Sequence, residues 1–111
     1  METICFKDWG VSLMQFARNV HFQIKPGKEK EFTTHFENEV LPMLRKQSGF
    51  KNELTLVNPN GAIGISLWED RKSAETYNTA TYPQVLATLN PFIVATPKVE
   101  TYDVTATTLR A

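Results

Sequence analysis

The segment Ala62–Trp68, AIGISLW, constrains the fold more than any other part of this chain. It predicts a β-strand with apolar residues at both alternating positions. One face carries Ile63, Ile65 and Leu67, and the other carries Ala62 and Trp68. A strand patterned in this way is covered on both sides, so it lies inside a sheet with neither face exposed to solvent.

Two small residues, Gly64 and Ser66, share the face of Trp68. They leave space beside a large indole, which indicates either the close approach of another layer or a cavity. Two assignments remain open. This face lines a cleft beneath helices, or it lies at an interface between two copies of the chain.

A second strand is predicted at residues 15–25, where the sequence QFARNVHFQIK alternates strictly. One face carries Phe16, Val20, Phe22 and Ile24, with Arg18 among them, and the other carries Asn19, His21 and Gln23. Further strands are predicted at residues 50–57 and 98–105. In the strand at 50–57, Phe50, Leu54 and Leu56 share one parity.

Helices are predicted between these strands. The first begins near Glu29 and runs to about Gln47, where Gly49 supplies a left-handed stop. Pro42 should kink or split it, because proline cannot donate the hydrogen bond to Asn38. Asp70 is the predicted N-cap of a second helix, and Pro83 begins a new helical segment.

The resulting order, β-α-β-β-α-β, predicts an α+β, ferredoxin-like fold with a four-stranded antiparallel sheet and helices on one face. The chain divides into an extension at residues 1–13, a domain at 14–105 and a tail at 106–111. Because the uncovered sheet face carries apolar residues, we expect two copies to associate as a homodimer through it.

Composition excludes several classes of protein. Twelve basic and twelve acidic residues cancel in the 111-residue chain, so there is no basic surplus for binding nucleic acid. No apolar run is long enough to span a membrane. The single cysteine, Cys5, indicates a reduced, cytoplasmic protein. Two histidines and one cysteine on separate elements do not form a metal signature.

Three sequence pieces resemble the antibiotic biosynthesis monooxygenase family of dimeric α+β barrels. They are the Pro26-Gly27 turn with Lys28 and Phe32, the segment LPMLRKQSGF at 41–50, and LWED-x-x-S-A-x-x-Y at 67–77. The resemblance covers roughly residues 14–105. It implies a monooxygenase without metal or flavin that acts on a small aromatic, quinol- or anthrone-like substrate.

Individual positions match this family unevenly. Trp68 is similar to a strand tryptophan of the anthrone-oxidising members, but their asparagine four residues earlier is Gly64 here. In the haem-degrading branch, a first-strand asparagine resembles Asn19 and a helical tryptophan falls on Tyr77. The iron-ligating histidine of that branch falls on Ala87, so haem binding and haem degradation are not expected.

We therefore expect a pocket between sheet and helices that binds a flat aromatic molecule. Its candidate catalytic residues are Trp68, Tyr77 and Arg18, and its candidate substrate-binding residues are Gly64, Ser66, Tyr82 and Asn19. Arg18 is the candidate for stabilising an anion.

Each candidate also has a structural interpretation. Trp68, Tyr77 and Tyr82 can pack as core aromatics, and Arg18 can form a salt bridge. His35 is interpreted as a surface partner of Glu39, and His21 as an interface hydrogen-bonding group. The carboxylates Glu37, Glu39, Glu53 and Glu75 are interpreted as solvated. On these interpretations the protein is a non-catalytic, small-ligand-binding or structural dimer of the same fold.

Overall fold

The structure, a computed structural model, describes residues 15–109. Four strands form one antiparallel sheet in the order β2-β3-β1-β4. The strands are β1 (Phe16–Phe22), β2 (Phe50–Asn58), β3 (Gly61–Trp68) and β4 (Lys98–Asp103). The predicted ferredoxin-like plan is confirmed, and β3, apolar on both faces, lies inside the sheet. The extension predicted at residues 1–13 lies outside the described residues.

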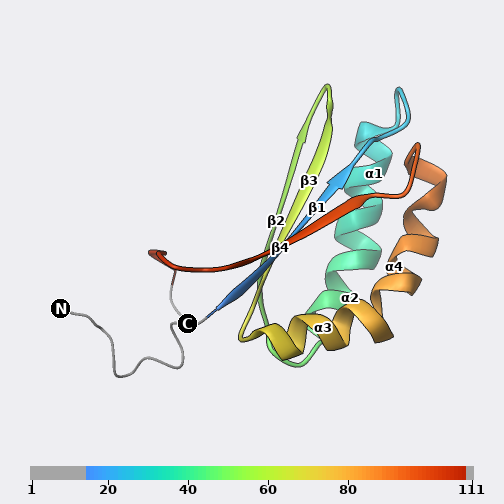
Figure 1. The fold of residues 1–111 in the computed structure, drawn as a ribbon. Helices are drawn as coiled ribbons and strands as arrows, with labels where there is room; N and C mark the ends of the chain where they lie inside the picture. Colours follow the sequence, from blue (N-terminus) through green and yellow to red (C-terminus); the bar gives the residue numbers. More distant parts are fainter. Residues whose placement is uncertain (1–14, 110–111) are drawn as a thin grey trace, which may run out of the picture.

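All helices pack on one side of the sheet (Figure 1). They are α1 (Glu29–His35), the π-helical turn η2 (Phe36–Val40), α2 (Leu41–Arg45), α3 (Arg71–Ala80), α4 (Tyr82–Leu89) and the short 3-10 helix η3 (Asn90–Phe92). None of the helices in residues 15–109 is long and apolar enough to cross a membrane.

Local signals account for a predicted helix break and a predicted helix start. The helix expected between Glu29 and Gly49 is split by η2, just before Pro42, which has no amide hydrogen to continue the ladder. α2 ends at Arg45, earlier than predicted, and Gly49, with a positive φ of 81°, lies in the turn that leads into β2. The Asp70 carboxylate accepts a hydrogen bond of 2.8 Å from the backbone N–H of Ser73 and caps α3.

The helices cover the face of the sheet that carries Trp68. Buried side chains from β1 and β3 pack there against the helices. The core consists of Phe16, Val20, Phe22, Ala62 and Trp68 from the sheet, and of Phe32, Phe36, Val40, Leu44, Ala74, Tyr77, Tyr82, Val85, Leu89 and Ile93 from elsewhere. Of the two assignments left open by the sequence, the structure therefore places Gly64, Ser66 and Trp68 beneath the helices.

A β-bulge in β2 changes the predicted pattern of that strand. The pairing register with β3 shifts between Phe50 and Asn52. Phe50 therefore packs edge-on against Trp68 on the helix side, with ring centroids 5.5 Å apart, whereas Leu54 and Leu56 lie on the open face. The expectation that these three residues share one face is wrong, because one extra residue inverts the alternation.

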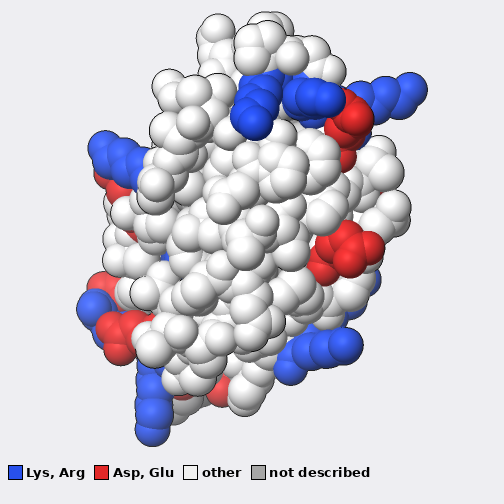
Figure 2. Space-filling model, turned by 90° about the vertical axis from the view of Figure 1, so that its right-hand side faces the viewer, with Lys and Arg blue, Asp and Glu red and all other residues white. Residues whose placement is uncertain are grey.

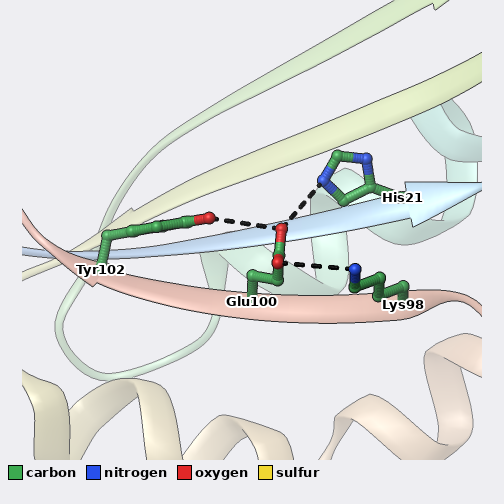
Figure 3. A network of polar contacts seen from close by, with 4 residues as sticks. All are labelled: His21, Lys98, Glu100 and Tyr102. Atoms are coloured by element: carbon green, nitrogen blue, oxygen red, sulfur yellow. Dashed lines mark hydrogen bonds and ion pairs between the residues drawn. The ribbon is translucent and has the colours of Figure 1, made fainter.

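The open face of the sheet has an apolar half and a polar half. The apolar half consists of Leu54, Leu56, Ile63, Ile65 and Leu67 on β2 and β3. The polar half, on β1 and β4, is centred on Glu100 (Figure 3). The contacts to this carboxylate come from His21 at 3.5 Å, Lys98 at 3.7 Å and the Tyr102 hydroxyl at 3.3 Å.

Charged side chains avoid the centre of the helix side. Figure 2 shows this side, with Lys, Arg, Asp and Glu gathered around its margin. The sequence explains the pattern, because residues 76–97, which include α4 and η3, contain no charged residue. The centre of the helix side is therefore uncharged.

Candidate functional site

Arg18 is a buried cation on the helix-facing side of β1. Only 3% of its surface is exposed, and its Nη2 donates a hydrogen bond of 2.7 Å to Oδ1 of Asn78 on α3. The guanidinium carbon lies 4.2 Å from the ring centroid of Tyr82 and 5.1 Å from that of Tyr77. No carboxylate of residues 15–109 forms a salt bridge with it.

Burial lowers the pKa of Arg18, but a guanidinium keeps its proton at neutral pH. A buried cation held by one amide and two aromatic faces is still short of negative charge. An anionic oxygen from a ligand can supply that charge. The salt-bridge interpretation of Arg18 is not supported by the contacts of the described residues.

A small internal cavity, the inner cavity, lies beside Arg18. Its volume is about 20 Å³, which is room for a single water molecule. Its lining consists of Arg18, Val20, Phe22, Phe36, Val40, Leu44, Glu53, Gly64, Ser66, Tyr77, Tyr82 and Val85. Five of the seven predicted site residues, Arg18, Gly64, Ser66, Tyr77 and Tyr82, are therefore brought together here.

Glu53 of β2 also lines the inner cavity, and the expectation that it is solvated is wrong. The Thr55 hydroxyl donates a hydrogen bond of 2.8 Å to Oε2 of Glu53. Burial raises the pKa of this carboxyl to about 8, although the Thr55 hydrogen bond and the charge of Arg18 act in the opposite direction. The alternation of β2 puts Glu53 on the face opposite Leu54 and Leu56, but the sequence does not show that the helices cover this face.

The two tyrosines close the cavity from above the sheet. Tyr77 of α3 and Tyr82 of α4 are 3% and 8% exposed. Burial raises the pKa of both phenols, so both stay neutral and can donate hydrogen bonds. The Tyr82 hydroxyl is buried and forms no well-aligned hydrogen bond within the described residues, although the adjacent Arg18 guanidinium opposes the rise of its pKa by charge and hydrogen bonding. A polar ligand or water can satisfy this hydroxyl.

Trp68 and Asn19 lie outside the cavity. Trp68 is fully buried, and its indole N–H donates a hydrogen bond of 2.8 Å to the Ser66 hydroxyl. Its ring lies 5.0 Å from that of Tyr77, so it supports a residue of the lining. Asn19 lies on the opposite face of the sheet, where it pairs with Glu100 of the neighbouring strand β4.

A larger hollow, the outer cleft, lies on the other side of Arg18. It has a volume of about 250 Å³ between α3 and strands β1 and β4. It is lined by Phe16, Arg18, Arg71, Ala74, Glu75, Asn78, Val99 and Thr101. Arg18 thus borders two spaces of different size, and Glu53 lines only the smaller one.

Other candidate groups do not converge on this site. His35 packs on Phe92, with ring centroids 5.0 Å apart, and forms no ion pair with Glu39 in the described chain. Ala87, the position that falls on a haem-ligating histidine, is exposed on α4. Across residues 15–109, no group of three or more His, Cys, Asp or Glu side chains is placed to hold a metal ion.

Solved structures of other proteins have a similar fold. SnoaB, a cofactor-independent oxygenase from Streptomyces nogalater, aligns with a TM-score of 0.71 at 15% identity, covering 87% of this chain and 99% of that one. A monooxygenase from the gene ActVA-Orf6 of Streptomyces coelicolor, solved with Nanaomycin D, aligns with a TM-score of 0.70 at 16% identity, covering 89% and 95%. The fold is that of the antibiotic biosynthesis monooxygenases.

This monooxygenase fold is also found in proteins whose activity is not stated. A conserved protein from Methanosarcina mazei Go1 aligns with a TM-score of 0.68 at 17% identity, covering 85% of this chain and 96% of that one. No protein-family model matches the sequence, and no curated protein is a significant match to it. At these identities the likeness extends to the fold, and activity has to be argued from the site.

Proposed function

We propose that this protein is a cofactor-independent monooxygenase that acts with dioxygen on a small aromatic substrate of the quinol or anthrone type. The observation that carries the proposal is Arg18, a buried guanidinium without a carboxylate partner in the described chain, placed between two tyrosines at the border of two cavities. The description of SnoaB as a cofactor-independent oxygenase supports the choice of reaction.

Dioxygen reacts slowly with closed-shell molecules unless the substrate becomes an electron-rich anion. The protein then has to remove a proton, stabilise the resulting phenolate or enolate, and exclude water. Arg18 supplies the positive charge for the anion, and the neutral phenol of Tyr82 supplies a hydrogen-bond donor. For an anthrone, one oxygen atom enters the ring as a carbonyl and the other leaves as water, so the reaction needs no external reductant.

The sizes of the two spaces suggest how such a substrate binds. The inner cavity, at about 20 Å³, cannot hold a ring. The outer cleft, at about 250 Å³, suits a small aromatic molecule whose oxygen points at Arg18. Phe16 and Val99 provide apolar contact, and Asn78 and Thr101 provide polar contact.

A non-catalytic ligand-binding protein is the second candidate. It is favoured by Gly64 at the position of the family's asparagine, and by the indole N–H of Trp68, which is already satisfied by Ser66. Both functions predict binding of an aromatic ligand beside Arg18. Only the first predicts consumption of oxygen.

Oxygen uptake tests the proposal. We expect the wild-type protein to consume oxygen with a quinol or an anthrone as substrate, and the variant R18Q to lose about 100-fold or more in rate because the anion loses its partner. R18K keeps the positive charge but lacks the planar guanidinium, so its rate should lie between those of the wild type and R18Q. Arg45 is exposed on α2, so R45Q is the matched control.

Two outcomes contradict the proposal. Full activity in R18Q would remove Arg18 from the mechanism. Saturable binding of the quinol by the wild-type protein without oxygen uptake would favour the ligand-binding function.

We further propose that the open sheet face binds a second copy of the chain. Its apolar half includes Leu54 and Leu56, which are 55% and 52% exposed. A groove of about 540 Å³ lies on this face near the β2–β3 turn, lined in part by His21, Leu56 and Ile63. It is larger than the outer cleft, but Arg18 is not among its lining residues, so we assign it to the dimer interface.

A further inference from the structure

Glu53 shares the inner cavity with Arg18 but has no part in the function proposed so far. The pairing register places Glu53 opposite Ser66, and Ser66 opposite Arg18. These three residues therefore form a row across β2, β3 and β1 on the helix-facing side. The carboxyl is held in this row by the hydrogen bond from Thr55.

We propose that Glu53 is the general base that removes the proton from a phenolic or enolic substrate held beside Arg18. This assignment rests on the proposed function of the site. In the step, the substrate O–H bond breaks and the proton passes to the Glu53 carboxylate. The electron pair stays on the substrate oxygen, so one negative charge moves from Glu53 to the oxygen beside the guanidinium.

The geometry provides a route for the proton. The substrate oxygen lies in the outer cleft, Glu53 lies in the inner cavity, and Arg18 borders both. The inner cavity has room for one water molecule, and Arg18, Tyr82 and Glu53 all line it. A general base can act through one intervening water. One water bound in the inner cavity would therefore relay the proton from a substrate oxygen at Arg18 to the carboxyl.

Among residues 15–109, the titratable groups that line the inner cavity with Glu53 are Arg18 from β1, Tyr77 from α3 and Tyr82 from α4. The rest of its described helical lining is apolar. The pKa of about 8 makes this carboxyl a much better match for a phenolic proton than an ordinary glutamate. It also means that the carboxylate form, which accepts the proton, is reached only as pH rises through about 8.

Two measurements test the assignment, and the first requires no oxygen chemistry. The probe is 4-nitrophenol, whose phenolate absorbs visible light. Under nitrogen and above pH 8, where Glu53 is a carboxylate, we expect binding of the ionised probe to take up a proton in the wild-type protein but not in E53Q, because Glu53 becomes protonated beside the phenolate. Glu37 is exposed and outside the site, so E37Q should match the wild type.

The second measurement is the pH profile of oxygen uptake. In the wild type, kcat/KM should rise with pH and level off above about 8. E53Q should lose this rise and about 100-fold of the rate, the lower range for general-base catalysis. T55V, which removes the hydrogen bond that lowers the pKa of Glu53, should move the rise to higher pH.

The outcomes separate the two proposals. If binding of the probe takes up a proton in the wild type but not in E53Q and no quinol is oxidised, the base assignment stands and the oxygenase function fails. If quinols are oxidised but E53Q keeps the wild-type proton uptake and pH profile, the base assignment is overturned. An unchanged profile in T55V would also overturn it, and this variant retains Glu53 if E53Q fails to fold.

Discussion

A Cβ atom placed on Gly64 would lie 3.2 Å from Oε2 of Glu53. The same atom would lie 3.4 Å from Cε2 of Phe22. The bare backbone of β3 thus allows a carboxyl group from β2 to lie over it, inside the helix-covered side. Because Gly64 has no side chain, it leaves the space that the Glu53 carboxyl occupies.

Substitution of Gly64 tests this arrangement. G64L should fill the inner cavity, displace the Glu53 carboxyl and so lower the rate of oxygen uptake, at a stability loss of about 1–3 kcal/mol from overpacking. The dimer should survive, because Gly64 lies on the helix side. Oxygen uptake with a quinol and light scattering measure the two effects. A monomeric G64L protein with unchanged oxygen uptake would contradict the assignment of faces.

The stability of the protein should depend on the protonation of Glu53. Because its pKa is raised from 4.5 to about 8, the folded state holds a proton that the unfolded state has lost. The stabilisation is fully present below about pH 4.5 and is lost as pH rises through about 8. Urea unfolding at a series of pH values should show this decline in the wild type.

The variant E53Q provides the comparison for that decline. It cannot titrate at this position, so its free energy of unfolding should fall less across the same pH range. E37Q, altered at an exposed glutamate, should follow the wild type. Parallel curves of unfolding free energy against pH for E53Q and the wild type would show that the pKa of Glu53 is not raised in the folded protein.

The hydrogen bond between Trp68 and Ser66 should contribute to stability. S66A leaves the buried indole N–H without an acceptor and should cost about 1–3 kcal/mol in the free energy of unfolding. Exposed Ser48 offers the control S48A, with little expected change. In a double-mutant cycle, S66A should cause little further loss of stability once W68F has removed the indole donor. Additive losses of stability would contradict the hydrogen bond.

Association through the open face should be sensitive to charge. L54E places a carboxylate in the apolar half of that face and should convert the dimer to a monomer in light scattering, with the fold retained by circular dichroism. Val94 is 59% exposed on a loop outside the sheet, so V94E is the matched control. A monomeric wild-type protein at micromolar concentration would refute the dimer itself.

Much of the fold follows from local patterns in the chain. Alternation alone puts Arg18 on the face of Phe16 and Val20, and it puts Gly64 and Ser66 on the face of Trp68. Pro42 and Asp70 locate a helix break and a helix start, because a missing amide hydrogen and a capping carboxylate act within one turn. These effects need no information from distant residues.

Only the tertiary structure determines which face of the sheet the helices cover and which residues surround Glu53. The sequence assigns two faces to β3 but does not say which is inside, since both carry apolar residues. The bulge after Phe50 then reverses the alternation of β2 and turns Glu53 inward. Burial is a property of the residues that meet a side chain from elsewhere in the chain, so the raised pKa of Glu53 emerges only when β2, β3, β1 and the helices are assembled around it.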